Sequence, residues 1–496
     1  MNDCFELEGL SPSVTHNGFA ILWRKPRPKT ELRHYQILLN GERGAICTCT
    51  DYTFKDLQPG KEYSVQVQAI TKNGEQLCSG SLTLTTKTAP VRLSVEDFGA
   101  IGDGKTLNTD AIQKAIDACE PGGMITVPAG VFVTGSLYLK SDMTLNLEDG
   151  SLLQGSADIG NYPIMRYRFE GLETDCYASL INTKETQGRH RNIAITGKGQ
   201  IDANGAALRQ AELEENRGRP GRAICLRNTD AVYLEGITVK QSPAWCVHLI
   251  YCNDTVVNGV TIRTKCDENG RRYEGIANGD GLDPDSCKNV YIFGCTIASQ
   301  DDCIAIKSGK DAPGRAVGIS TERVRVSNCR FLSGFGVVIG SEMSGDVRDV
   351  LVEDCIYENA YSVASIKAPR GRGGVVEDVV YRDIEFKNMS TEHCDCEWFR
   401  GALYIDMYYS HISFDLTDYK PFDETTPVFR NIHFENITAD TVAGNAIYFA
   451  GLPESPLTGI TLENVWVKGL YGMKLYNVAQ LRQNGVNVVQ YKQNGV

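Results

Sequence analysis

The chain has 496 residues, 42% of them hydrophobic and 23% charged, with 49 glycines but only 17 prolines. This is the composition of a globular protein, and the length exceeds one ordinary domain, so we expect two domains or a small domain attached to a large repetitive one. The formal net charge of −12 argues against a nucleic-acid or membrane-surface partner, because both are polyanionic.

The same negative charge would repel an acidic sugar, which would therefore need a local cationic pocket. The alternative is that the basic residues near the motifs described below form an ordinary solvated face. The candidates for such a pocket are Lys307, Lys310, Arg315, Lys367, Arg370 and Arg372.

Seventeen cysteines, an odd number without a paired framework, predict reduced thiols in a cytoplasmic protein. Cys47-Thr-Cys49 and Cys394-Asp-Cys396 lack the spacing of metal sites. The start of the chain shows no basic segment followed by an apolar one, and no run of about 18 apolar residues occurs. A secreted or periplasmic protein whose signal peptide had been removed would look the same, so that location is the alternative.

Residues 1–88 read as short alternating strands separated by Gly and Pro turns, which is the pattern of a β-sandwich. Trp23, the turn Leu57-Gln-Pro-Gly60 and Tyr63 resemble a fibronectin type III module, in which a tyrosine corner fixes the turn before a central strand. Its aromatic residues are more typical of a core than of a binding platform, so a structural role is expected. Residues 89–94 are interpreted as a linker.

Residues 95–496 are interpreted as one large domain, in which an internal repeat recurs from about residue 190 onward: an alternating strand, then Gly, Asn or Asp, then an apolar pair. Examples are Val290-Tyr-Ile-Phe-Gly-Cys295, Val324-Arg-Val-Ser-Asn-Cys329 and Val350-Leu-Val-Glu-Asp-Cys355. Repeats about 25 to 35 residues apart are too short for a βαβ unit and suit the coils of a parallel β-solenoid. The segment 108–117, with Asn108 or Thr109 as N-cap, predicts a helix that covers the first open end.

Acidic residues occur at equivalent places on two neighbouring repeats, in Asn278-Gly-Asp280-Gly-Leu-Asp283 and in Gln300-Asp301-Asp302-Cys303. Stacked coils would bring Asp280, Asp301 and Asp302 close together, and like charges so close raise one pKa. Glycoside hydrolysis needs such a set, with one protonated acid and one ionised carboxylate. The alternatives are ordinary turn formers or a calcium site.

These two motifs resemble those of glycoside hydrolase family 28, the polygalacturonase-like enzymes, and the resemblance runs from about Val95 to the end. Phe98-Gly-Ala-Ile-Gly-Asp-Gly104 is similar to the opening of the family. The resemblance implies a right-handed parallel β-helix, and so an all-β chain. It also implies inversion with Asp301 as general acid and with Asp280 and Asp302 activating water, whereas Asn278 and Asp283 help to position the sugar. No cofactor or metal is expected.

Two family motifs are altered. Gly334-Phe335-Gly336 stands where the family has Gly-His-Gly, and Ser365-Ile366-Lys367 stands where it has Arg-Ile-Lys. Lys367 remains, but serine cannot replace a bidentate arginine grip on a sugar carboxylate. The leaving-side sugar could then be neutral, with Phe335 stacking on it; alternatively the coil is shifted so that Arg370 or Arg372 takes over the grip.

The insert Lys265–Gly275 and the segments Gly340–Gly345 and Arg370–Gly374 resemble the exo-acting branch of the family. The expected activity is release of galacturonate from the non-reducing end of galacturonan or rhamnogalacturonan oligosaccharides. A related exo-glycosidase that releases rhamnose, apiose or xylose is the main alternative. A calcium-dependent lyase and a carbohydrate-binding solenoid without catalysis are the others. The sequence selects no oligomeric state.

Overall fold

The computed structural model describes residues 5–184, 186–392, 399–409 and 415–491, so Cys394 and Cys396 lie outside the described residues. The chain divides into two units. The first comprises Met1–Arg92 with Gly122–Met124, and the second comprises Leu93–Pro121 with Ile125–Val496. Each unit has its own hydrophobic core.

The first unit has two antiparallel sheets around a core that contains Trp23 and Tyr35, whose rings meet edge to face at 5.1 Å. The backbone N–H of Gln58 donates to the hydroxyl of Tyr63 at 2.9 Å, which is the predicted tyrosine corner. The sandwich is therefore confirmed. Its strands are β1 (Leu7–Gly9), β2 (Phe19–Trp23) and β5 (Asp51–Phe54) in one sheet, and β3 (Leu32–Leu39), β4 (Glu42–Cys47), β6 (Glu62–Thr71), β7 (Gln76–Cys78) and β8 (Leu82–Thr85) in the other.

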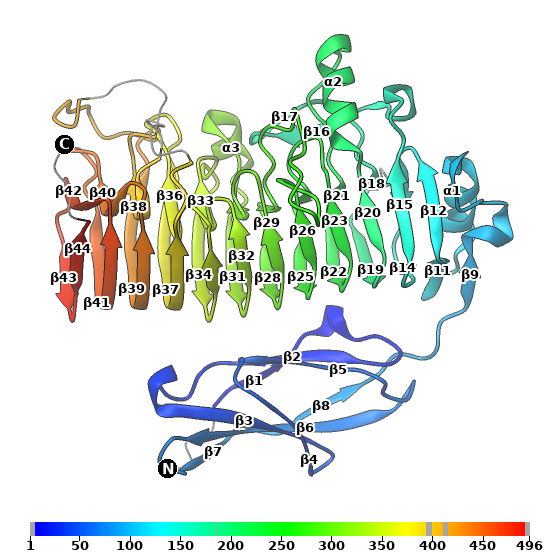
Figure 1. The fold of residues 1–496 in the computed structure, drawn as a ribbon, viewed down its shortest axis with the longest axis horizontal. Coiled ribbons are helices and arrows are strands. Elements are labelled where there is room, and N and C mark those ends of the chain that lie inside the picture. The colour runs from blue at the N-terminus through cyan, green and yellow to red at the C-terminus, as the bar shows by residue number, and fades with distance from the viewer. Residues whose placement is uncertain (1–4, 185, 393–398, 410–414, 492–496) are drawn as a thin grey trace. The chain divides into compact units, whose positions relative to one another are not determined.

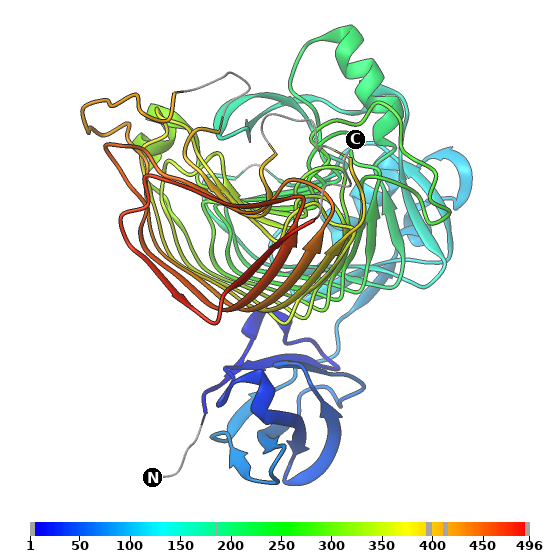
Figure 2. The same cartoon turned by 60° about the vertical axis from the view of Figure 1, so that its left-hand side comes forward.

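The second unit is a parallel β-helix, as predicted (Figures 1 and 2). A sheet of 23 strands begins with β9 (Arg92–Ser94), which pairs with β11 (Gly123–Val127), and β10 (Asp103–Leu107), and it ends with β44 (Asn487–Gln490). Each coil around the site adds two strands to this sheet and one to an 11-stranded sheet, which we call the site sheet. The site sheet consists of β13 (Leu137–Leu139), β18 (Ile181–Thr183), β21 (Ile224–Arg227), β24 (Val247–Ile250), β27 (Leu282–Asp285), β30 (Ile304–Ile306), β33 (Val337–Gly340), β36 (Ala364–Lys367), β38 (Gly401–Asp406), β40 (Asn445–Ala450) and β42 (Tyr471–Tyr476).

The recurring Gly, Asn or Asp of each repeat lies at the turn between the two strands that a coil gives to the larger sheet. Gly294, Asn328 and Asp354 all have φ between +53° and +63° there. Gly, Asn and Asp tolerate this left-handed conformation best. The repeat predicted from sequence therefore marks the position at which every coil bends.

The residue after this turn points into the core and is a cysteine in three successive coils. Cys295, Cys329 and Cys355 are buried, and each thiol donates to the carbonyl two residues earlier, at 3.3 to 3.4 Å. Cysteine serves there as a small apolar residue. All the cysteines in the described part of the chain are free thiols.

Helix α1 (Thr109–Ala118) buries Ile112, Ala115 and Ile116 in the core of the first coils. This is the predicted capping helix. Asn108 is at its N-cap position, but its side chain accepts from Ile101 N–H at 2.7 Å and donates to carbonyls of the preceding loop. No helix in the described ranges is long and apolar enough to cross a membrane.

A β-hairpin interrupts the coils between β15 (Ser151–Gly155) and β18. Its strands β16 (Ile164–Phe169) and β17 (Leu172–Tyr177) form a separate two-stranded sheet, and β17 makes one further isolated bridge, between Cys176 and Arg219. Figure 1 shows this hairpin with α2 (Gly205–Glu215) and α3 (Asp311–Val317) on one side of the coils, away from the long row that contains β14 (Met143–Leu147) and β19 (His190–Gly197). The hairpin forms one boundary of the site described next.

Candidate active site

The register of the site sheet places the predicted catalytic aspartates side by side. Leu282 of β27 pairs with Ile304 of β30, so Asp280 and Asp302, each two residues before these, occupy the same position on neighbouring coils. Neighbouring parallel strands lie about 4.8 Å apart. Asp301 precedes Asp302 directly, so the fold brings all three carboxylates into one cluster.

Lys307, just after β30, is the countercharge of this cluster. Its Nζ lies 3.2 Å from Glu342 Oε2, 3.7 Å from Asp280 Oδ2 and 3.8 Å from Asp283 Oδ1. It also lies 4.6 Å from the centre of the Trp245 ring. Lys307 is thus occupied by three carboxylates of the protein, which leaves it little capacity for a sugar carboxylate.

Lys367 of β36 is the second cation of the cluster. Its Nζ donates to both carboxylate oxygens of Asp302, at 3.1 and 3.4 Å, and lies 5.0 Å from the centre of the Tyr409 ring. The ammonium therefore stabilises the negative charge of Asp302. The lysine retained in the altered family motif contacts a catalytic aspartate directly.

Burial and mutual repulsion shift the acids upward. Burial, with the neighbouring charge of Asp302, raises the pKa of Asp301 to about 6. Burial raises the pKa of Asp283 to about 8, and burial together with the charges of Asp283 and Asp301 raises that of Asp280 well above its usual value. Glu342 differs: burial alone would raise its pKa, but Lys307 and Arg372 lower it to about 2.

The cluster thus holds five carboxyl groups around two ammonium groups. Because the negative charges outnumber the positive ones, some of the acids retain their protons near neutral pH. A protonated Asp301 can donate to a glycosidic oxygen, while Asp302, beside Lys367, offers a negative carboxylate in the same place. A general acid next to an ionised carboxylate is the equipment that glycoside hydrolysis requires.

The hairpin closes one side of the cluster through buried contacts. Arg168 of β16 contacts Asp285 at 3.0 Å and donates to Ser286 Oγ at 2.8 Å. Phe169 stacks on Trp245 with ring centres 4.9 Å apart. At the tip, the backbone N–H of Lys310 donates to the carbonyl of Gly171 at 3.2 Å.

His248 of β24 lies beneath the hairpin contacts and pairs in register with Asp283 of β27 in the site sheet. Burial lowers its pKa to about 3, and its Nε2 lies 3.5 Å from Asp285 Oδ2. Burial alone would raise the pKa of Asp285, but Arg168 and His248 hold it below its usual value. The neutral His248 and the Arg168–Asp285 pair therefore form a buried polar contact between the hairpin and the site sheet.

Three other predicted binding residues, Phe335, Arg370 and Arg372, contact other side chains of the protein. Phe335 is only 1% exposed, and its ring packs against Tyr361 and Phe399 at 4.9 and 5.9 Å between ring centres. Arg370 contacts Glu454 at 2.5 Å, and Arg372 contacts Asp311 at 2.5 Å and the Ser341 carbonyl at 2.8 Å. The prediction that Phe335 offers an open face for stacking on a sugar is therefore wrong, because the ring is buried in the core. Both arginines are engaged by the protein itself.

The remaining candidates lie at the edge of the cluster. Asn278 is exposed in a left-handed turn (φ +51°) just before Asp280. Arg315 donates to the carbonyls of Gly371 and Arg372, and so holds the loop that carries Arg372. Ser365 pairs in register with Val338 and Tyr404, so the sheet is not shifted at the altered motif.

Sequence reasoning missed Glu342, Trp245, Asp285 and Arg168. Trp245 could have been found, because it stands two residues before β24 just as Asp280 and Asp302 stand two residues before β27 and β30. Arg168 could not, since its contact with Asp285 joins segments 117 residues apart. Among the described residues no group of three or more His, Cys, Asp or Glu is arranged to hold a metal ion.

The fold and this cluster define a carbohydrate-cleaving enzyme of the carboxylate-dependent class on a parallel β-helix. Comparison with known proteins makes this assignment specific. The pattern of "Glycosyl hydrolases family 28" matches residues 123–486, and that of "Fibronectin type III domain" matches residues 8–85. The chain belongs to glycoside hydrolase family 28 and carries an N-terminal fibronectin type III domain.

Two relatives and one solved structure illustrate the similarity. A probable polygalacturonase of Vitis vinifera is 34% identical over 392 residues, which cover 75% of this chain and 74% of that protein. An exo-poly-alpha-D-galacturonosidase of Dickeya chrysanthemi is 30% identical over 451 residues, 83% of this chain and 71% of that one. The family 28 exopolygalacturonase of Yersinia enterocolitica, 22% identical, superposes with a TM-score of 0.83 over 97% of this chain and 99% of that one, which supports the fold.

Proposed function

We propose that the protein is an exo-acting, inverting hydrolase that releases galacturonate from the non-reducing end of galacturonan or rhamnogalacturonan oligosaccharides. The observation that carries this proposal is the cluster in which Asp301, with its raised pKa, lies beside Asp302 and Lys367. The polygalacturonase names of the relatives support galacturonate as the sugar.

In this mechanism Asp301 gives its proton to the glycosidic oxygen as the bond from that oxygen to the anomeric carbon breaks. Asp302, held by Lys367, accepts a proton from water, and the oxygen of that water bonds to the anomeric carbon from the opposite face. Asp280 contributes to positioning this water. Because Asp301 must be protonated, kcat/KM should fall as the pH rises above about 6.

The hairpin supports exo action. Its contacts at Arg168, Phe169 and Gly171 bound the charged cluster on the side of the β24 coil. The loop that carries Lys265 is fixed in place as well, because Lys265 Nζ lies 2.7 Å from Glu392 Oε2. A groove that is closed at one end admits a terminal sugar only.

A second candidate differs in the leaving sugar. Ser365 replaces the family arginine, and Arg370 and Arg372 are paired with Glu454 and Asp311. The leaving-side carboxylate thus lacks an arginine, which favours a neutral leaving unit such as rhamnose. A related activity that releases rhamnose, apiose or xylose would use the same aspartates.

The test follows released sugars, reducing ends and absorbance at about 235 nm on oligogalacturonides and rhamnogalacturonan oligosaccharides, with and without EDTA. The proposal expects free galacturonate that is insensitive to EDTA and absent in Asp301→Asn. Faster release from rhamnogalacturonan fragments would identify a neutral leaving unit. Absorbance that grows and is lost with EDTA would mean a lyase instead.

A further inference from the structure

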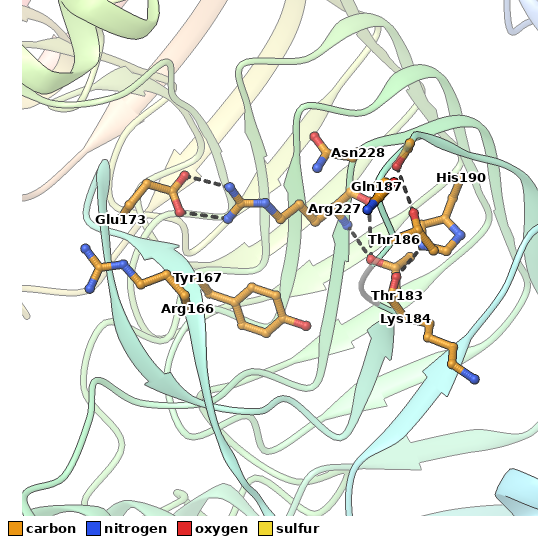
Figure 3. A pocket seen from close by; sticks show the side chains of 11 residues that line it. Arg166, Tyr167, Glu173, Thr183, Lys184, Thr186, Gln187, His190, Arg227 and Asn228 are labelled. Carbon is orange, nitrogen blue, oxygen red and sulfur yellow. Dashed lines mark hydrogen bonds and ion pairs between the residues drawn. The ribbon is translucent and has the colours of Figure 1, made fainter.

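A cavity of about 510 Å³ lies beside the hairpin, and its lining contains no residue of the catalytic cluster. Figure 3 shows Glu173 and Arg227 in contact above the ring of Tyr167, with Thr183, Lys184, Thr186, Gln187 and His190 on the side away from Glu173. The hairpin lines this cavity with Arg166, Tyr167 and Glu173. The volume is sufficient for one or two sugar rings.

The walls of the cavity are held by internal hydrogen bonds. Thr183 Oγ1 accepts from Arg227 N–H at 3.0 Å, and Arg227 contacts both oxygens of Glu173 at 2.8 and 2.9 Å. The ring of His190 contacts the Lys184 carbonyl at 2.5 Å and Ser141 Oγ at 3.3 Å. The cavity is therefore a preformed feature rather than a gap between loose side chains.

The charge of the lining is opposite to that of the whole chain. Among the described residues that line it, three are cationic, Arg166, Lys184 and Arg227, and one is a carboxylate, Glu173, in a protein of net charge −12. Arg166 and Lys184 make only exposed contacts, with Asp175 at 3.3 Å and Asp117 at 3.6 Å. Such contacts contribute little, so an incoming carboxylate can replace them.

Among the described residues that line the cavity, Glu173 is the single carboxylate and it is held by Arg227, whereas hydrolysis requires two acidic groups. We propose that this cavity is a second binding site for an acidic sugar, a galacturonate unit or a short galacturonide, distinct from the catalytic cluster. The choice of galacturonate rests on the proposed function. Binding there would hold a pectic chain near the enzyme and raise its effective concentration.

The test titrates digalacturonate into the full chain carrying Asp301→Asn, which prevents turnover, by calorimetry. Two binding events are expected, and Arg166→Glu with Lys184→Glu should weaken one of them by about tenfold or more. Lys198→Glu, an exposed charge reversal outside the cavity, should leave both events unchanged. The neutral disaccharide galactobiose should bind the second site at least about tenfold more weakly.

With Asp301 intact, the same double substitution should leave kcat and KM for digalacturonate unchanged and raise the KM for polygalacturonate, which also shows that the variant folds. A single binding event that the double substitution does not alter would overturn the proposal. Equal binding of galactobiose would overturn the acidic class of ligand. Because the titration needs no turnover, a failure of the proposed hydrolase activity would be seen separately.

Discussion

The outer face of the site sheet has two regions that differ sharply although their backbones are equivalent. Over β27, β30 and β36 it carries buried charges, among them Asp280, Asp302 and Lys367. Over β21 and β24 it is covered by Tyr167 and Phe169 of the hairpin, which pack on Cys225 and Ile250, and its charged Arg227 is paired with Glu173 of the same hairpin. The same coil backbone carries either surface, so the position of the catalytic cluster is set by the side chains and by the extent of the hairpin.

The largest expected effect tests the charged region. Asp301→Asn keeps the shape of the side chain but removes the acid, so kcat on oligogalacturonides should fall by about 10²- to 10⁴-fold. Stopped reducing-sugar assays measure this change. The melting temperature should not decrease, because the variant removes a buried carboxyl that repels Asp302. Activity close to that of the wild type would exclude Asp301 as the acid.

The second prediction tests the covered region. Arg168 and Asp285 are 1% and 0% exposed, so Arg168→Met leaves a buried carboxylate without its partner and should reduce the free energy of unfolding by about 3 to 5 kcal/mol. Denaturant titration measures it.

The double variant Arg168→Met with Asp285→Asn removes both charges and is the control for that prediction. It should recover a large part of the lost stability. A single variant as stable as the wild type would show that this pair does not hold the hairpin. Products longer than one sugar from Arg168→Met would show that the hairpin enforces exo action.

The two regions also differ in how far the sequence alone predicted them. The repeat with its Gly, Asn or Asp turns, as at Asn328 and Asp354, predicted the coils, and the coil register then predicted the aspartate cluster. The hairpin was not predicted, because β16 pairs only with β17 and carries no repeat. The burial of Phe335 was missed, because a single position does not show which neighbouring rings cover it.

The third prediction concerns the free energy of unfolding, which the buried charges of the catalytic cluster lower. The folded-state pKa of Asp283 is raised to about 8, so its contribution to stability is present below about pH 4 and is lost as the pH rises through 8. Asp283→Asn should therefore stabilise the protein by about 1 to 3 kcal/mol at pH 8 and by much less at pH 5, while activity falls. Denaturant titrations at both pH values measure this. A gain that is equal at the two pH values would contradict the assigned pKa.

The smallest effect is expected at an exposed ion pair, which is the counterpart of Arg168–Asp285. Arg330 contacts both oxygens of Glu358 at 2.9 and 3.0 Å, a better geometry than that of the buried pair, but the side chains are 57% and 46% exposed. Water solvates both charges when the contact is lost, so Arg330→Met should change the free energy of unfolding by no more than about 0.5 kcal/mol. Comparison with Arg168→Met under the same conditions separates burial from geometry. If both variants lost equal stability, geometry rather than desolvation would govern ion pairs on this β-helix.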